Sequence, residues 1–131
     1  MIWSPTIDTA ALDGETLNHL LPTLVNLNID YLRAVGPDNV PPLYETRVRY
    51  IPDLFGRERW ATIPHVYRRG CADCKSLCAW RVAELNVRGN NAKCGWIETG
   101  PQQYHIVVCH EDGSIEDPSL ELGMGWKEGF R

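Results

Sequence analysis

Cys74 is the residue whose type and position most clearly suggest chemistry. It lies in the stretch 70–77, where a loop runs directly into a long apolar segment, so it is predicted to stand at the N-terminus of a helix. Unpaired backbone N–H groups and the positive end of the helix dipole stabilise a thiolate at such a position, and we expect them to lower the cysteine pKa. The same amides can hold the oxyanion that forms during acyl transfer. Cys74 is therefore the candidate nucleophile.

A thiol nucleophile needs a base that takes up its proton and later protonates the leaving group. His105, near the start of a strand predicted over 103–110, is the candidate for this base. Asp117 is the candidate for the carboxylate that fixes the imidazole tautomer. An isolated strand histidine is more often a satisfied core residue. A cysteine at a helix start and an aspartate on the histidine face together favour the catalytic interpretation.

The position of Asp117 depends on the loop before it. Glu-Asp-Gly at positions 111–113 is a natural three-residue hairpin loop, in which a type I turn is followed by a glycine in the left-handed region. That loop places Asp117 opposite Val107, on the same sheet face as His105 and diagonal to it. A two-residue loop would turn Asp117 away from His105. Glu116 would then share the face of His105, but it would lie too far along the strand to reach the imidazole. The three-residue loop therefore favours Asp117.

Two helical segments are expected to position these residues. Apolar residues recur at helical spacing over about 13–35, and Gly36-Pro37 ends that segment. Pro22 leaves open whether it is one kinked helix or two. A central helix is predicted from about Cys74 to Arg88, apolar on most sides and followed by Gly89. It should therefore lie in the core.

The rest of the chain predicts a small sheet. Strands are predicted over 92–99 and 103–110, with a short third over 113–117. The proline-rich stretch 36–70 predicts extended connections, with one strand at 46–51, in preference to long helices. The order is helix, irregular segment, helix and antiparallel meander. This order indicates an α+β fold in which the helices are segregated from the sheet.

The segment 70–119 also carries a recognisable combination of motifs. A cysteine precedes a core helix that ends in glycine, a strand carries a histidine, and an aspartate precedes a proline: Cys74, Cys78, Trp80, Ala83, Leu85 and Gly89; Tyr104-His105-Ile106-Val107-Val108; Asp112-Gly113; and Glu116-Asp117-Pro118-Ser119. These motifs and their order resemble the transglutaminase-like and papain-like cysteine peptidases. The N-terminal half of the chain lies outside the resemblance.

The resemblance implies a transglutaminase-like core, with the nucleophile on a central helix packed against a small antiparallel sheet. It implies acyl chemistry on a protein or peptide substrate through Cys74, His105 and Asp117, without a metal or cofactor. Hydrolysis is favoured over transfer to an amine, because an amine acceptor needs a second binding site. The oxyanion glutamine of papain corresponds here to Arg68, and Trp60 is an alternative donor. The compact likeness also suggests a phage protein.

Zinc binding is the main chemical alternative, because Cys71 and Cys74 form a Cys-x-x-Cys half-site. Two further ligands would have to come from Cys94, His105, Cys109 and His110. The last two are adjacent and would point to opposite faces of a strand, which weakens this interpretation. Cys78, Cys94 and Cys109 are otherwise expected to be small buried hydrophobic residues.

The length and composition of the chain are those of one globular domain. The 131 residues are 44% hydrophobic and 23% charged, which fits a single domain over 1–131 with a catalytic core at about 60–120. A net charge of -4 and a pI near 5.5 argue against non-specific nucleic-acid binding, which needs a basic surface. The five cysteines are an odd number and are expected to be reduced thiols.

No apolar run is long enough to span a bilayer, and the first residues lack the order of a secretory signal. We therefore expect a cytoplasmic or virion-associated protein without a membrane partner. The competing functional class is an inert binding or assembly module on the same fold, such as a viral structural component. A Cys74 that is unreactive, or buried away from His105, would favour that class.

Overall fold

Apolar residues at helical spacing form one continuous N-terminal helix, α1 (Gly14–Val35). The computed structural model describes residues 6–9, 13–53, 58–101 and 103–125. Asp13 caps α1 by accepting a hydrogen bond from the Thr16 amide at 2.7 Å. Pro22 lies within the helix on its exposed side, so the buried face continues past it. The sequence left one helix or two open, and the structure has one.

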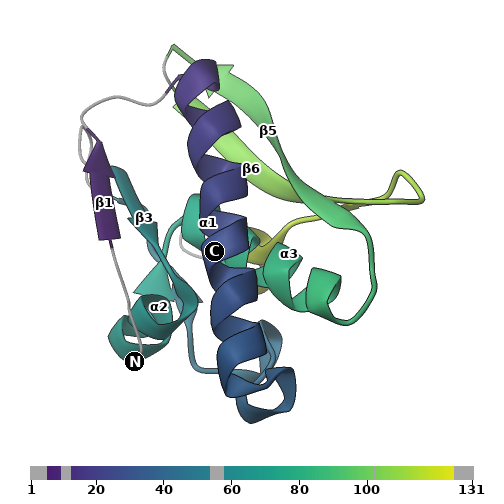
Figure 1. The fold of residues 1–131 in the computed structure, drawn as a ribbon. Helices are drawn as coiled ribbons and strands as arrows, with labels where there is room; N and C mark the ends of the chain where they lie inside the picture. The colour runs from purple at the N-terminus through teal and green to yellow at the C-terminus, as the bar shows by residue number, and fades with distance from the viewer. Residues whose placement is uncertain (1–5, 10–12, 54–57, 102, 126–131) are drawn as a thin grey trace.

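The central helix is α3 (Cys74–Val87), as the sequence predicts. It packs against α1 and against the sheet, and Figure 1 shows it behind α1, which runs along much of the height of the molecule. Side chains all around α3 are buried, among them Leu77, Cys78, Trp80 and Val82. The helix thereby joins two apolar clusters, one shared with α1 and the sheet and one shared with the segments before α3.

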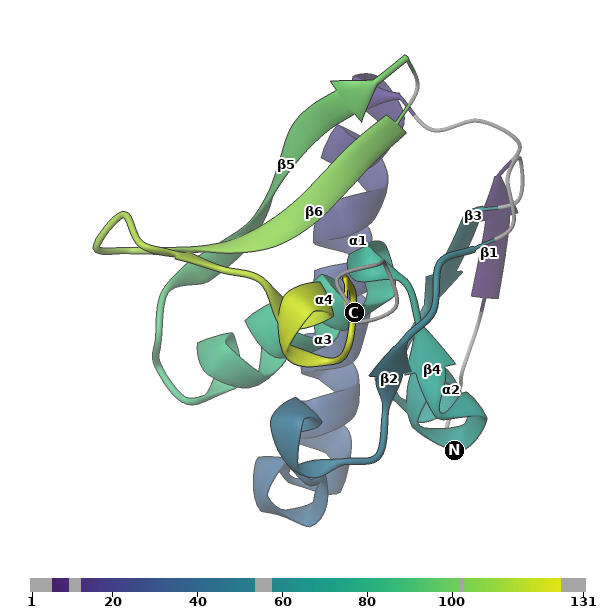
Figure 2. The same ribbon diagram turned by 180° about the vertical axis from the view of Figure 1, so that it is seen from behind.

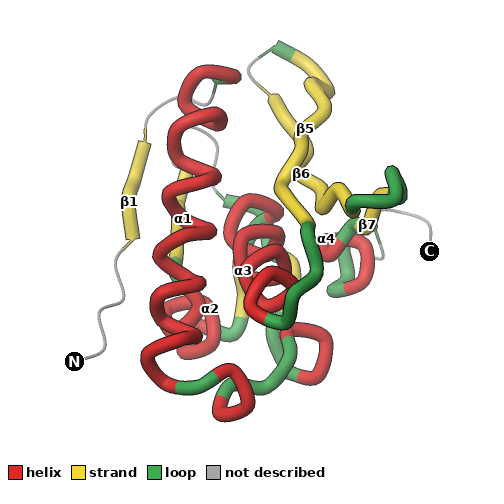
Figure 3. The backbone as a smooth tube through the Cα atoms, turned by 45° about the vertical axis from the view of Figure 1, so that its right-hand side comes forward, coloured by secondary structure: helices red, strands yellow, loops and turns green. Residues whose placement is uncertain are grey.

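The antiparallel sheet has the order β5 (Ala92–Gly100), β6 (Gln103–His110) and β7 (Ile115–Glu116). The strand predictions are confirmed, except that β7 is shorter than expected because α4 (Pro118–Glu121) begins directly after Asp117. Figure 3 shows β7 leading into α4 beside the end of the sheet. The fold is α+β, as predicted.

The predicted three-residue loop between β6 and β7 is also present. The His110 amide donates to the Ser114 carbonyl at 2.9 Å, and the Gly113 amide donates to the His110 carbonyl at 3.0 Å. Gly113 has a φ of +90°, in the left-handed region. The strands pair Val108 with Glu116. The predicted register is therefore confirmed.

The segment 36–70 is more regular than the sequence predicts. The predicted strand at 46–51 is reduced to β2 (Arg49–Tyr50), which pairs in parallel with β4 (Cys71–Ala72). The expectation of extended connections in preference to long helices is confirmed for the described part of this segment, whose longest helix has seven residues, although the segment also contains a second strand and that short helix, which the sequence did not predict. The further elements are β1 (Thr6–Thr9), which pairs with β3 (Glu58–Ala61), the 3-10 turns η1 (Pro37–Asn39) and η2 (Leu43–Glu45), and α2 (Ile63–Arg69).

Figure 2, seen from behind, shows β2 and β4 side by side and α4 in front of α3. The chain after the three-stranded sheet thus returns to α3 from this side. None of the helices that the structure describes is long and apolar enough to cross a membrane.

Replacing Gly113 tests whether the left-handed turn holds this register. A Cβ at Gly113 would meet nothing within 4 Å, so the cost of Gly113→Ala comes from the backbone conformation. We expect Gly113→Ala to lower the free energy of unfolding by about 1 to 2 kcal/mol, measured by urea denaturation. Gly113→Asn should cost less, because asparagine adopts this conformation more readily. Equal stability of Gly113→Ala and wild type would contradict the explanation.

Candidate active site

Cys74 is the first residue of α3, as predicted, but it is largely enclosed. Only 9% of its surface is exposed, and it belongs to an apolar cluster that includes Trp60 and Ile106. Burial and the neighbouring Asp73 carboxylate raise the pKa of the Cys74 thiol to about 12, against the opposing effects of Lys75 and of a backbone hydrogen bond from Ile106. The expected lowering of the pKa is therefore wrong for this arrangement. At neutral pH the thiol is protonated.

His105 and Asp117 come together as the hairpin geometry predicts. His105 Nε2 lies 2.7 Å from Asp117 Oδ2, and the two side chains are 21% and 19% exposed. Bonding through Nε2 leaves Nδ1 as the ring nitrogen that can exchange a proton with another group. The pair therefore has the form of an imidazole base oriented by a carboxylate.

Asp117 is itself held in place by α4. It is the N-cap of that helix, and its Oδ1 accepts hydrogen bonds from the amides of Ser119 at 3.1 Å and Leu120 at 3.3 Å. Its two oxygens thus have separate partners, since Oδ1 caps the helix and Oδ2 faces His105. An N-cap with two amide donors is a rigid anchor for the imidazole.

The helix that begins at Cys74 approaches strand β6 at Ile106, the residue after His105. Cys78, one turn after Cys74, donates from Sγ to the Ile106 carbonyl at 3.2 Å. Cys74 also lies against the Ile106 backbone. Among the residues that the structure describes, no hydrogen bond joins Cys74 to His105. The structure therefore brings His105 and Asp117 together, and places Cys74 beside the strand of His105 without a hydrogen bond between the two among the described residues.

A buried lysine next to Cys74 is a feature that the sequence analysis missed. Lys75 is 1% exposed, and its ammonium group pairs with three carboxylates: Glu58 at 2.6 Å, Asp53 at 3.2 Å and Asp73 at a shorter distance. The pKa of Lys75 is raised by these acids, although burial alone would lower it. Lys75 therefore remains a cation and joins the start of α3 to the residues around β3.

The three acids outnumber the one cation. Burial raises the pKa of Asp73 to about 7, and the Asp53 charge adds to this effect while Lys75 opposes it. Oxygens of Asp53, Glu58 and Asp73 lie within 4.8 Å of one another, which is a spacing that could hold a metal ion. The Lys75 ammonium is hydrogen-bonded to all three, so the protein supplies its own cation at this point.

The N-cap of α3 limits which backbone amides can donate a hydrogen bond to an oxyanion. Asp73 is the N-cap of α3, and its Oδ1 accepts from the Lys75 amide at 3.2 Å. This hydrogen bond engages the Lys75 amide, so the amide of Cys74 itself is the better candidate donor. Trp60 is 1% exposed and packs in the core, and Arg68 lies in the last turn of α2.

The cysteines do not assemble the alternative zinc site. Of the residues described, Asp53, Glu58 and Asp73 form the one group of three possible ligands that meets the spacing of a metal site, and no cysteine belongs to it. His105 and His110 are each engaged by a carboxylate. All five cysteines are free thiols, of which Cys78 is buried as expected, whereas Cys94 and Cys109 are only partly buried.

Comparison with known proteins gives no assignment. No protein-family model matches the sequence, and neither the curated proteins nor the solved structures yield a match. The chemical interpretation therefore depends on the geometry of the described residues.

The pKa of Cys74 makes its reactivity testable. We expect iodoacetamide to alkylate Cys74 slowly at pH 7.5, because few of the thiols are ionised and the sulfur is enclosed. A raised pKa means that the thiolate fraction grows about tenfold with each pH unit above neutrality, without a plateau near the ordinary value of about 8.5. Rates with site assignment by mass spectrometry, from pH 6 to 10, measure this. A plateau for Cys74 below pH 9 would contradict the burial argument.

Asp73→Asn separates charge from access at Cys74. Asparagine can still cap α3 but removes the carboxylate that raises the Cys74 pKa, so alkylation should become several-fold faster. The pKa of Asp73 is about 7, so the acceleration should be clear at pH 8.5 and weak at pH 6, where wild-type Asp73 is already neutral. Asp38→Asn, at an exposed side chain, is the matched control. Equal rates for Asp73→Asn and wild type at pH 8.5 would show that access alone limits Cys74.

Lys75→Met tests the buried cation. Three clustered carboxylates would lose their counter-ion, and we expect a loss of roughly 3 to 5 kcal/mol in the free energy of unfolding at pH 8. Acids whose folded pKa is raised destabilise the protein as pH rises, so the deficit should shrink at pH 5. Urea denaturation at both pH values measures it. Lys93→Met, at an exposed lysine, is the control and should change the free energy of unfolding little. If Lys75→Met changes it as little as Lys93→Met does, the buried cation does not stabilise the three carboxylates.

Proposed function

We propose that this protein is a thiol-dependent amide hydrolase that acts on a protein or peptide substrate. The observation that supports it is the 2.7 Å contact between His105 Nε2 and Asp117 Oδ2. This pair lies on the strand and turn that pack against the helix beginning at Cys74. A cysteine, an oriented imidazole and a helix start are the parts that acyl transfer through a thiol requires.

The raised pKa of Cys74 favours general-base catalysis over a preformed thiolate. As the sulfur bonds to the carbonyl carbon, its proton passes to His105 Nδ1, and the Cys74 amide holds the oxyanion. The C–N bond then breaks, and His105 returns the proton to the departing amine. Water attacks the thioester, giving a proton to His105, and cleavage of the C–S bond releases the acid while that proton restores the thiol. Asp117 keeps the imidazole in the tautomer that serves both halves.

We also propose that the fold is a transglutaminase-like and papain-like core. Two observations support this: the helix that begins at Cys74 packs on an antiparallel sheet, and cysteine, histidine and aspartate follow one another in chain order. We favour hydrolysis over transfer to an amine, because water needs no binding site of its own.

A second candidate function is an inert binding or assembly module on this fold. The observation that favours it is the enclosure of Cys74, which is 9% exposed and has no hydrogen bond to His105 among the described residues. In such a module the His105 and Asp117 pair would join β6 to α4, and Cys74 would be a core residue.

The experiment that tests the hydrolase is a cleavage assay with denatured casein, in which new amino termini are labelled and counted by mass spectrometry. Cys74→Ala and His105→Ala should each reduce cleavage by roughly 10³-fold or more, because a triad acts as a unit. Asp117→Asn should also impair it while keeping the helix cap. A parallel sample with a dansylated amine detects transfer in place of hydrolysis.

Cys71→Ala is the matched control, because Cys71 is a partly exposed free thiol close to Cys74 in the chain. It should cleave like wild type. Wild-type protein that yields no new termini, or Cys74→Ala protein that retains full activity, would overturn the hydrolase proposal and favour the inert module.

A further inference from the structure

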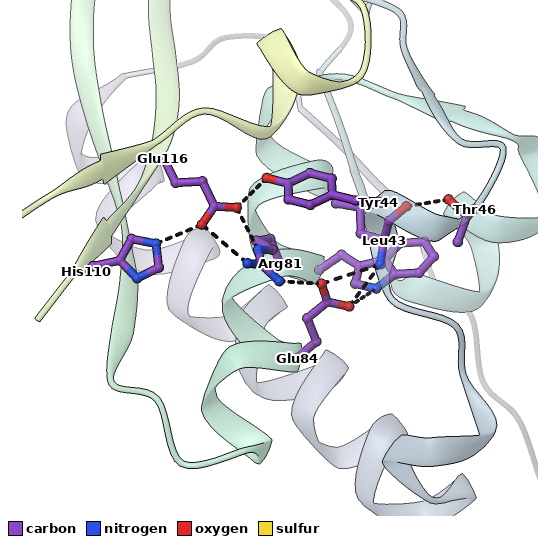
Figure 4. A network of polar contacts seen from close by, with 8 residues as sticks. Leu43, Tyr44, Thr46, Arg81, Glu84, His110 and Glu116 are labelled. Atoms are coloured by element: carbon purple, nitrogen blue, oxygen red, sulfur yellow. Dashed lines mark hydrogen bonds and ion pairs between the residues drawn. The ribbon is translucent and has the colours of Figure 1, made fainter.

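Glu116 is the centre of a polar network beside the candidate site (Figure 4). Its Oε2 accepts hydrogen bonds from Arg81 Nε at 2.6 Å and from the Tyr44 hydroxyl. Its Oε1 lies 2.7 Å from His110 Nε2. The Glu116 side chain is 19% exposed. Burial alone would raise its pKa, but these three donors outweigh burial and hold it below the ordinary value. Glu116 is therefore a fixed anion.

Arg81 connects this network to the nucleophile helix. It lies on α3 two turns after Cys74, so the two residues share a side of the helix. Its guanidinium group also pairs with Glu84 at 3.0 Å and lies 4.9 Å from the Tyr44 ring centre. Such a planar, multiply bonded guanidinium has little freedom to move.

The far side of the network is fixed as well. Glu84 Oε1 accepts from the Leu43 amide at 3.1 Å and from the Trp80 indole at 3.1 Å. Arg81 is thus held between Glu84 and Glu116, and the short turn η2, which carries Leu43 and Tyr44, closes the arrangement (Figure 4).

Glu116 lies directly before Asp117. Strand β7 has two residues and ends at Glu116, and Asp117 then leaves the strand to cap α4. So short a pairing leaves the end of β7 weakly held by the sheet alone. The Arg81 clamp supplies the missing restraint, because it fixes the residue bonded to Asp117 relative to the same helix that carries Cys74.

We propose that Glu116 is a positioning residue, whose clamp to Arg81 holds Asp117 against His105. The catalytic meaning of this inference rests on the proposed function, whereas the positioning itself is a property of the fold. Glu116 touches no reacting group. Its effect on activity acts through Asp117. Replacing Glu116 should therefore cause no further loss once Asp117 has been replaced and no longer orients His105.

The test is nuclear magnetic resonance of protein with ¹⁵N-labelled histidine side chains. In wild type the His105 Nε2 proton, bonded to a carboxylate, should give a downfield, slowly exchanging signal, assigned by its loss in His105→Gln and Asp117→Asn. Glu116→Gln should broaden or abolish this signal in folded protein. Glu111→Gln, an exposed glutamate in the same hairpin, is the matched control and should leave it unchanged.

Activity supplies a second readout on the casein assay. Glu116→Gln should lower kcat several-fold with little change in KM, and adding it to Asp117→Asn should cause no further loss. If Glu116→Gln fails to fold, Tyr44→Phe removes one donor with little loss of packing, and it should still accelerate exchange of the His105 proton relative to Glu111→Gln.

A His105 signal in folded Glu116→Gln as strong and as slowly exchanging as in Glu111→Gln would overturn the inference. Inactivity of the wild-type protein would instead count against the hydrolase, while the resonance result still decides the positioning role. The two failures are therefore distinguishable.

Discussion

The burial of α3 on almost every side is the constraint that organises this protein. A helix so enclosed must find partners inside the protein for every polar group that it carries. Lys75 is met by acids near β3, and Arg81 is met by Glu84 on its own helix and by Glu116 from β7. The short, irregular elements around α3 are held in place largely because they supply these partners, so the polar contacts of one helix position much of the chain.

The same constraint creates a tension at the candidate nucleophile. Helix geometry at Cys74 favours a thiolate, whereas burial and the Asp73 cap favour the thiol, and the second effect is larger. The N-cap that starts the helix is thus the anion that suppresses ionisation of the residue after it. If a substrate carbonyl binds here, the thiol loses its proton to the imidazole during the attack on the carbonyl and not before it.

Local rules predicted the parts of the fold that local chemistry determines. Gly113 and its loop were sufficient to predict the register of β7, and with it the pairing of His105 with Asp117. The environment of Lys75 could not be predicted, because two of its three partners, Glu58 and Asp53, lie 17 and 22 residues away in the sequence and contact it only through the tertiary fold. The Cys74 pKa was mispredicted because the apolar pattern places the helix in the core but does not show how far its first residue is enclosed, and there burial outweighs the helix dipole.

The two oxygens of Asp117 bear on the choice between enzyme and inert module. A residue that only starts α4 needs one oxygen for the amides of Ser119 and Leu120, and Oδ1 serves both. The second oxygen could have remained in water at no cost to the helix. Instead, Oδ2 meets an imidazole nitrogen on a neighbouring strand, and both side chains keep about a fifth of their surface exposed. A pair that is oriented, yet still open to solvent, suits proton exchange better than it suits a structural tie, which gains most from full burial.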